Sequence, residues 1–400
     1  MFPTFFMFKQ SKENIRMELI ARFPHAKRII FFVGFGVEKD GHRGICGPEK
    51  RFLQTCQMIQ TSRILPIVIY PYCGRLFEDF QRLSQKNRII LVGYEPKGRW
   101  HYCKILYQTI KRYAPYKIHC QGPHLFDLIA AVLGKYLRVQ TIITRPVNIS
   151  QDYLNPIKKF IYYSFDMVIT RNANHLIAIS STHMEQWCNE LSTLKSSSQK
   201  KKVKVIYNGI FLNQFFQPED RAPAPPVVFT ISAQITPVKG HTLLLSVVHQ
   251  LKNAGYHFYV NIMGDGPLKP DLEIMCKDLR IDSIVRFHGH VTRITSVLKD
   301  THIVVLPSFR EGLSLALLEG MAMGCPLIAS KVGASHELID NGKNGFLVKK
   351  KSSAELYLAM KYFLDHPLQI QHMGKKSLEK VLKYDIFKMF EAYCRLYMSD

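Results

Sequence analysis

The stretch SFREGLSLALLEGMAMGCPLIAS, residues 308–330, decides the fold of this chain more than any other part of its sequence. Two carboxylates, Glu311 and Glu319, stand eight positions apart in it. The apolar run HIVVLP at 302–307 predicts a buried strand before them. The stretch LALLEGMA, which contains Glu319, predicts a helix before the next apolar run. Gly324 then stands where a left-handed helix cap is wanted. The order strand, loop, helix, strand is typical of an α/β domain.

The loop that feeds this helix predicts a phosphate site. A helix N-terminus has unpaired backbone N–H groups and positive dipole potential, and here Gly312, Leu313 and Ser314 precede the helix. Glu311 can reach hydroxyl groups beyond the phosphate, whereas Glu319 lies beside whatever carries the phosphate on its other side. Hydroxyls, a diphosphate and a ribose together make a nucleotide sugar. The alternative is a surface helix with two solvated glutamates.

This pattern resembles the retaining GT-B glycosyltransferases, also called glycosyltransferases group 1, in which a Glu-x7-Glu pair grips the donor. The resemblance covers most of residues 28–400 and is densest over residues 203–348. It implies an α/β fold of two doubly wound parallel-sheet domains that face each other across a cleft. It also implies that Glu311 contacts the sugar hydroxyls without acting as a covalent nucleophile, and that Glu319 contacts the ribose.

The resemblance assigns further roles in the donor site. Lys239 matches the lysine that family members place on the diphosphate, so Lys239 and Glu311 are the candidate catalytic residues. Gln234 stands where the family usually has arginine, which removes a positive charge from the leaving diphosphate. Gly47 matches a glycine-rich loop of the first domain that approaches the diphosphate.

Three weaker candidates complete the site. His290 and Val291 lie where family members hold the base through backbone groups, although a histidine at a strand end is often structural. Arg145 follows a predicted strand at a point where many members carry an active-site histidine. It is a candidate contact for an acidic acceptor, and the alternative is a structural ion pair.

Apolar runs alternate with helical stretches along the whole chain, which predicts parallel sheets. Residues 217–226 contain four prolines and predict a linker. We therefore expect an acceptor-side domain over residues 1–216 and a nucleotide-sugar domain over 227–378. The resemblance implies that a terminal helix, about residues 379–400, packs back on the first domain.

The formal charge is +23, of which residues 1–200 carry +16. Such an excess suggests an anionic membrane surface, an acidic acceptor or nucleic acid as a partner. Because the sequence has no nucleic-acid-binding motif, we do not expect nucleic acid.

No apolar run approaches the length of a membrane span. The apolar start breaks at Lys9 without a cleavage site, and the nine cysteines lack metal-ligand spacing. These features predict a cytoplasmic protein bound peripherally to the cytoplasmic face of a membrane.

The expected function is transfer of a sugar, with retention, from a UDP- or GDP-sugar to a glycan or lipid-linked acceptor in cell-surface polysaccharide or lipopolysaccharide synthesis. Lys239 and the N–H groups of residues 312–314 would stabilise the leaving diphosphate. Because no Asp-x-Asp motif is evident, we expect no metal and no cofactor beyond the co-substrate. A nucleotide-sugar-binding subunit with little turnover and a basic nucleic-acid-binding protein remain as alternatives.

Overall fold

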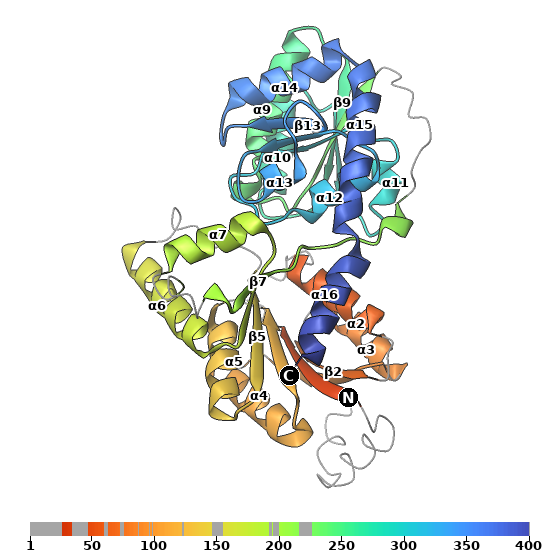
Figure 1. The fold of residues 1–400 in the computed structure, drawn as a ribbon. Coiled ribbons are helices and arrows are strands. Elements are labelled where there is room, and N and C mark those ends of the chain that lie inside the picture. The colour runs from red at the N-terminus through yellow and green to blue at the C-terminus, as the bar shows by residue number, and fades with distance from the viewer. Residues whose placement is uncertain are drawn as a thin grey trace, which may run out of the picture.

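The computed structural model describes residues 26–33, 47–59, 63–72, 76–86, 88–95, 97, 99–121, 124–145, 155–191, 194, 200–215 and 226–399. Two α/β domains follow one another along the chain, and the tail returns to the first of them (Figure 1). The prediction of two parallel-sheet domains is confirmed.

The first domain is built on a seven-stranded sheet in the order β3-β2-β1-β4-β5-β6-β7, with parallel neighbours throughout. Its strands are β1 (Lys27–Val33), β2 (Ile64–Pro71), β3 (Ile90–Tyr94), β4 (Lys117–Gln121), β5 (Gln140–Arg145), β6 (His175–Ala178) and β7 (Val203–Val205). The strand order reverses direction between β1 and β4. Ligands of doubly wound sheets bind at such a switch point, beyond the carboxyl ends of the strands.

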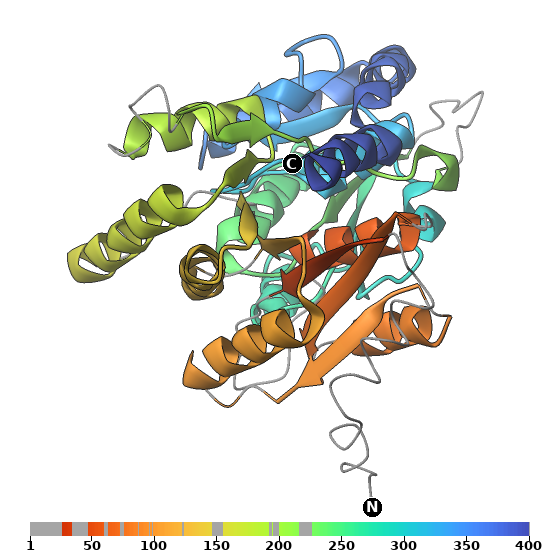
Figure 2. The same cartoon turned by 60° about the horizontal axis from the view of Figure 1, so that its bottom comes forward.

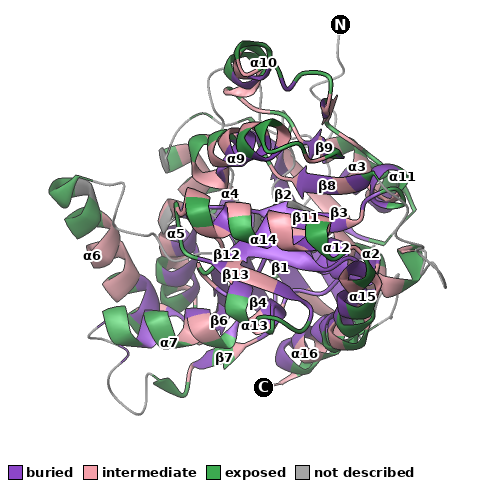
Figure 3. Ribbon diagram, turned by 90° about the horizontal axis from the view of Figure 1, so that it is seen from above, coloured by how far each residue is buried: buried purple, intermediate pink, exposed green. Residues whose placement is uncertain are grey.

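Helices cover both faces of this sheet. One face packs against α2 (Gly47–Met58) and α3 (Phe77–Gln85) through a core that includes Phe52 and Phe80. The other face packs against α4 (Arg99–Tyr113), α5 (His124–Tyr136), α6 (Pro156–Asn172) and α7 (Ser181–Glu190). Figure 3 shows the strands as the most deeply buried layer, and every residue of β2 and β4 is buried. Strands of a parallel sheet that is covered on both faces are buried in this way.

The second domain repeats this plan on a six-stranded parallel sheet in the order β10-β9-β8-β11-β12-β13. The strands are β8 (Val227–Ser232), β9 (Phe258–Met263), β10 (Val285–Gly289), β11 (Ile303–Leu306), β12 (Leu327–Ser330) and β13 (Gly345–Val348). The helices are α9 (His241–Asn253), α10 (Lys269–Asp278), α11 (Thr295–Leu298), α12 (Leu315–Ala322), α13 (Ser335–Leu338), α14 (Ser353–Asp365) and α15 (Leu368–Val381). Short 3-10 turns occur at η3 (Leu212–Gln214), η4 (Pro237–Lys239) and η5 (Leu382–Tyr384).

The last helix, α16 (Ile386–Met398), lies on the sheet of the first domain, beside α2 and α3 (Figures 1 and 2). It begins later than the expected residue 379, because Val381 and Tyr384 still belong to the core of the second domain. Tyr393 and Tyr397 are almost fully buried. Burial of a large apolar side chain contributes about 1.5–3 kcal/mol, so this helix holds the two domains together firmly.

A buried lysine fixes the end of α16. Lys117 of β4 is inaccessible to solvent, and its ammonium group donates to the carbonyl oxygens of Leu396 at 2.8 Å and Ser399 at 2.6 Å. The last carbonyls of a helix have no intrahelical partner and carry negative dipole potential, so a cation there both satisfies and stabilises them.

The expected linker falls mostly outside the described residues, since residues 217–225 are not among them. The chain before it pairs with the returning tail. The backbone of Ile210 accepts from Ile386 at 3.0 Å and donates to Tyr384 at 3.0 Å. None of the helices in the described part of the chain is long and apolar enough to span a bilayer.

Candidate functional site

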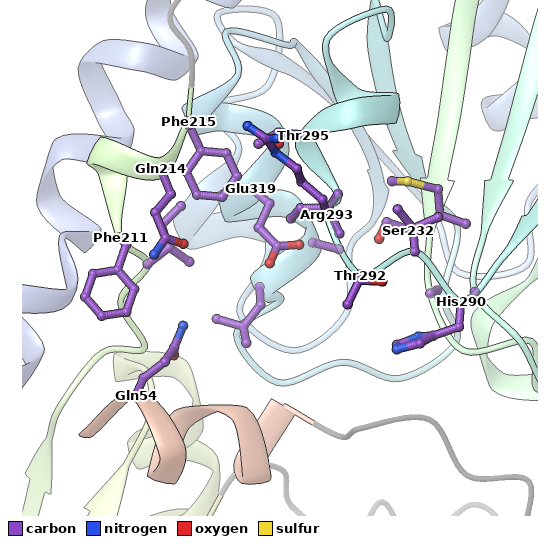
Figure 4. Close-up of a pocket in the computed structure, with 18 of the residues that line it drawn as sticks. Gln54, Phe211, Gln214, Phe215, Ser232, His290, Thr292, Arg293, Thr295 and Glu319 are labelled. Atoms are coloured by element: carbon purple, nitrogen blue, oxygen red, sulfur yellow. The ribbon is translucent and has the colours of Figure 1, made fainter. Parts of the chain in front are cut away.

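A cleft of about 830 Å³ lies between the two domains, beyond the carboxyl ends of β8, β9 and β10. Its walls come from α2 and Leu76 of the first domain, the 210–215 connection, the three loops after β8, β9 and β10, and α12 (Figure 4). The polar and charged groups that line it are Gln54, Asn213, Gln214, Ser232, Gln234, Asp265, His290, Thr292, Arg293, Thr295 and Glu319.

Helix α12 carries Glu319 into this cleft. Ser314 caps the helix, with its hydroxyl accepting from the N–H of Leu317 at 3.4 Å. Glu319 stands on the second turn, is only 6% exposed and lies in the middle of the cleft, between Arg293 and Gln214 (Figure 4). Because its carboxylate lines the cleft from a largely buried position, Glu319 is placed to accept hydrogen bonds from hydroxyl groups of a bound ligand.

The backbone at the start of α12 also reaches the cleft, but through different residues from those expected. Leu315 and Ala316 line it, whereas Gly312, Leu313 and Ser314 do not. The reason is that Ser314 is the cap, so the first helical N–H groups belong to the two residues after it. Leu313 turns inward instead, and its carbonyl accepts from the Asn208 amide at 3.3 Å.

The two expected catalytic residues contact each other directly. The ammonium group of Lys239 lies 2.6 Å from Glu311 Oε1, and the two side chains are 24% and 11% exposed. Neither is among the lining residues of the cleft, and Glu311 lies three residues before Ser314, the cap of α12. Because both side chains are mostly shielded from water, the pair is held more firmly than a surface ion pair.

Two glycines bring this pair together. Gly240 has φ +74°, and a Cβ there would lie 2.1 Å from the Pro307 carbonyl oxygen. Gly333 has φ +52°, and its Cβ would lie 2.0 Å from the carbonyl oxygen of Glu311. Only glycine allows both the left-handed backbone and these close approaches. The loop that carries Lys239 is thereby pressed against the end of β11, and the Glu311 loop against the turn after β12.

A buried histidine follows Lys239. His241 is the first residue of α9 and is 2% exposed. Burial, with a smaller contribution from the Lys239 charge, lowers the pKa of His241 to about 4. The imidazole is therefore neutral at physiological pH, and Lys239 keeps the positive charge of this loop.

Gln234, His290 and Val291 line the cleft, as does Gln54 on α2 of the first domain. Gln234 and His290 are exposed to solvent in it. Gly47 is the first residue of α2, the helix that carries Gln54, while the rest of its expected glycine-rich loop, including Cys46, lies outside the described residues.

Arg145 forms the structural ion pair that the sequence left open as the alternative to an acceptor contact. It is 3% exposed, forms an ion pair with Asp166 of α6, and has its Nε 3.8 Å from Asp127 Oδ2 of α5. Its guanidinium also stacks 5.6 Å from the ring centre of Trp187. Arg145 therefore ties α5, α6 and α7 to the end of β5 and does not line the cleft.

Arg293 is a cleft residue that the sequence did not single out. Among the described lining residues it is the only arginine or lysine, and it extends beside Glu319 (Figure 4). Phe211 and Phe215 on the interdomain connection were likewise missed. The signal was weak in each case, because all three stand in short irregular segments whose neighbours depend on the tertiary fold.

A second set of contacts joins the domains at the far side of α12. Glu337 of α13 accepts from the Thr182 N–H at 2.8 Å and from the Tyr207 hydroxyl at 2.7 Å. Thr182 lies in the first turn of α7, where a carboxylate is favoured by the helix dipole. Although partial burial opposes it, the hydrogen bonds from Thr182 and Tyr207 lower the pKa of Glu337.

Residues 225–366 match the family model described as Glycosyl transferases group 1. Over this domain the chain is similar to the group 1 glycosyl transferases. The match covers α12, both glutamates and Lys239, and it confirms the family suggested by the motif.

Individual relatives agree with this assignment. A glycosyltransferase of Salmonella typhimurium named for colanic acid biosynthesis, WcaL, is 26% identical over 205 residues, which are 49% of this chain and 50% of the relative. A D-inositol 3-phosphate glycosyltransferase of Streptomyces avermitilis is 25% identical over 231 residues, 53% of this chain and 49% of that protein. The chain thus spans about half the length of the curated relatives it matches.

The fold similarity extends over nearly the whole chain. The crystal structure of HepE from Anabaena in complex with UDP-glucose superposes with a TM-score of 0.73. The superposition covers 92% of this chain and 98% of that one, at 18% sequence identity. The first domain therefore shares the architecture of the HepE structure, although the sequence identity is low.

Proposed function

We propose that this protein is a glycosyltransferase that binds a nucleotide sugar in the interdomain cleft and transfers its sugar to a glycan or lipid-linked acceptor. The observation that carries the proposal is the position of Glu319, buried on α12 in the middle of the cleft, with the first backbone N–H groups of the same helix beside it. In this proposal Glu319 accepts from the ribose hydroxyls, and the N-terminal end of α12 faces the diphosphate.

The Lys239–Glu311 pair locates the bond that breaks. In the proposed complex the donor extends from the cleft to this pair, where Lys239 binds the diphosphate and Glu311 binds sugar hydroxyls. Their 2.6 Å separation requires that the sugar and phosphate parts of the donor meet beside them. As the bond between the anomeric carbon and the phosphate oxygen breaks, negative charge grows on the diphosphate. Lys239 and the helix N-terminus stabilise that charge without a proton transfer.

We propose that transfer proceeds with retention and needs no divalent metal. The charge that a metal would neutralise is assigned to Lys239, with Arg293 as a second cation in the cleft. The acceptor would enter between α2 and the second domain, past Gln54. The relative named for colanic acid biosynthesis supports a surface polysaccharide as the product class.

A second function, nucleotide-sugar binding with little turnover, is favoured by one specific feature. Gln234 lines the cleft where the family usually has arginine, and it brings no charge to the diphosphate. Purified protein should therefore be incubated with UDP-, GDP- and ADP-sugars, first for thermal stabilisation and then for release of the nucleoside diphosphate.

We expect one donor to stabilise the protein and to release its nucleoside diphosphate. Glu311→Ala should abolish this release, and EDTA should leave it unchanged. Stabilisation without any release, with or without candidate acceptors, would support the binding subunit. If no nucleotide sugar stabilises the protein, the proposal is wrong.

A further inference from the structure

Helix α6 presents an apolar stripe to solvent. Its exposed residues Ile157, Phe160, Ile161 and Val168 are spaced so that they share one side of the helix, and their exposed fractions are 71%, 70%, 43% and 39%. The opposite side packs into the domain, where Ile169 is inaccessible. An amphipathic helix normally buries its apolar side, so the outward stripe on α6 is an additional surface that nothing in the described structure covers.

The two neighbouring helices carry the same kind of stripe. On α4, Trp100, Lys104, Tyr107 and Lys111 follow one another at helical spacing, and all four are exposed. On α5, the exposed side chains include Val132, Lys135 and Tyr136. Among the described residues, eight of the sixteen exposed large hydrophobic side chains belong to these three helices.

The three helices form one continuous side of the molecule. α5 packs against α4 on one flank and α6 on the other, and all three contribute to the same core layer. Figure 2 shows them ranged along the same side of the first domain. A surface that combines their stripes is wide enough to meet a flat partner rather than a single peptide.

The charge of this side is of one sign. The exposed cations of the three helices are Lys104, Lys111, Lys135, Lys159 and Arg171. Their only acidic groups among the described side chains, Asp127 and Asp166, are occupied by Arg145. Lys202 lies close to this cluster: its partial burial and the nearby charge of Lys135 lower its pKa.

We propose that the outer side of α4, α5 and α6 binds an anionic lipid bilayer, with the α6 stripe and Trp100 entering the headgroup region. Exposed apolar and aromatic side chains interleaved with lysines are what an interfacial helix needs, and each basic residue near an anionic leaflet contributes to binding. Nucleic acid would use the lysines but leave the aliphatic stripe unexplained. A second copy in a two-fold dimer would bring the same positive surface against itself.

This placement also serves the cleft. Helices that cross over between parallel strands run antiparallel to them, so the N-terminal end of α6 lies at the carboxyl edge of the sheet, where the cleft is. Ile157, Phe160 and Ile161 stand at that end. A bilayer bound there would bring a lipid-linked acceptor to the edge of the cleft. This advantage rests on the proposed function, whereas binding to the bilayer does not.

The chain contains its own reporter for the test. It has two tryptophans, of which Trp100 is 88% exposed and Trp187 only 2%. Full-length protein would be titrated with two kinds of phosphatidylcholine vesicle, one with about 30% phosphatidylglycerol and one with none. Tryptophan emission and co-sedimentation would be recorded for each. We expect a blue shift and sedimentation with the anionic vesicles only. The blue shift should disappear in Trp100→Phe, and sedimentation should weaken as salt rises.

Matched variants distinguish vesicle binding by this surface from non-specific adsorption of the protein. The triple change Ile157→Ser, Phe160→Ser and Ile161→Ser should weaken vesicle binding by about tenfold or more. The control Ile274→Ser, Leu358→Ser and Leu368→Ser alters equally exposed apolar residues of the second domain and should change little. Reversal to Glu at Lys104, Lys111 and Lys135 should weaken binding by at least about a hundredfold, and reversal at Lys277, Lys299 and Lys343 should not.

Three results would overturn the proposal: binding that ignores lipid charge, binding unaffected by both first-domain sets, or a concentration-dependent dimer that the α6 changes dissociate. Oligonucleotide binding tighter than vesicle binding and lost in the lysine reversals would assign the surface to nucleic acid instead. Nucleotide binding is measured in every variant. Its absence throughout would refute the proposed function, whereas vesicle binding would still decide the membrane proposal.

Discussion

The two domains share an architecture but divide their charged groups differently. In the second domain, Glu319 and Arg293 line the cleft, and Lys239 and Glu311 form a partly buried ion pair with each other. In the first domain, Arg145 is buried in structural contacts, and the exposed lysines cover the outer side of α4 to α6. The comparison teaches that the motif residues lie in the half proposed to bind the donor, while the exposed lysines of the other half lie on the surface that we propose for membrane binding.

The largest expected effect concerns Arg145. Arg145→Met should lower the free energy of unfolding by about 3–5 kcal/mol, because it leaves Asp127 and Asp166 buried without their cation. Denaturant unfolding measures this change. The variant Arg145→Met with Asp166→Asn should recover part of the loss. Full stability together with a raised KM for the acceptor would place Arg145 in acceptor binding and erase the contrast between the domains.

Lys239 should have a different profile. Lys239→Ala should reduce turnover about 10²- to 10³-fold, since a positioned donor to the leaving group is lost. Its loss of stability should be smaller than that of Arg145→Met, because one carboxylate rather than two loses its cation. Steady-state release of nucleotide measures the effect, with Lys331→Ala, an exposed neighbour, as the control. Turnover within a factor of two of the wild type would exclude Lys239 from the chemistry.

Gln234 tests whether the donor half has been weakened in this chain. Gln234→Arg should raise turnover or donor affinity by about tenfold, because a charge-assisted hydrogen bond to the diphosphate is worth about 1.5–3 kcal/mol. The same change made together with Arg293→Gln shows whether Arg293 already compensates. A neutral Gln234→Arg that becomes beneficial only without Arg293 would identify Arg293 as the replacement cation.

Acidification should affect the two domains in parallel but modestly. Burial first, and then a neighbouring cation, lowers the pKa of His183 in the first domain and His241 in the second to about 4. A depressed folded-state pKa means that stability is complete above about pH 6.5 and is lost as pH falls toward 4, because the unfolded chain takes up the protons. Tm measured across this range should fall by a few degrees or more, and less steeply in His241→Leu than in the exposed-site control His372→Leu.

The sequence predicted the scaffold well because its signals are local. Apolar strand runs gave both sheets, and the Glu-x7-Glu stretch placed Glu319 on the second turn of α12, where it reaches the cleft. The details that failed depend on tertiary partners. Arg145 could not be assigned without knowing that Asp127 and Asp166 come from two other helices to meet it. Leu315 and Ala316 replaced residues 312–314 because the cap position sets which N–H groups are open.

The outer stripes of α4 to α6 show a further limit of sequence reasoning. The aromatic and basic pattern around Trp100 was visible, and Ile105, Leu106 and Ile110 gave the same helix a side to bury. Only the fold shows that the helix does both, with Leu106 inaccessible and Trp100 exposed. The side chains of α6 likewise became a surface feature once Ile169 was seen to take the buried side.

Calorimetry on two glutamate variants tests the central claim most directly. Binding of the free nucleoside diphosphate and of the corresponding nucleotide sugar would be measured for wild type, Glu319→Ala and Glu311→Ala. We expect Glu319→Ala to weaken both ligands by about tenfold or more, since the ribose is common to them. Glu311→Ala should weaken only the nucleotide sugar and leave the nucleoside diphosphate unchanged or tighter, because Lys239 is released from its 2.6 Å ion pair. Unchanged nucleotide affinity in Glu319→Ala, or equal loss of both ligands in Glu311→Ala, would contradict the account.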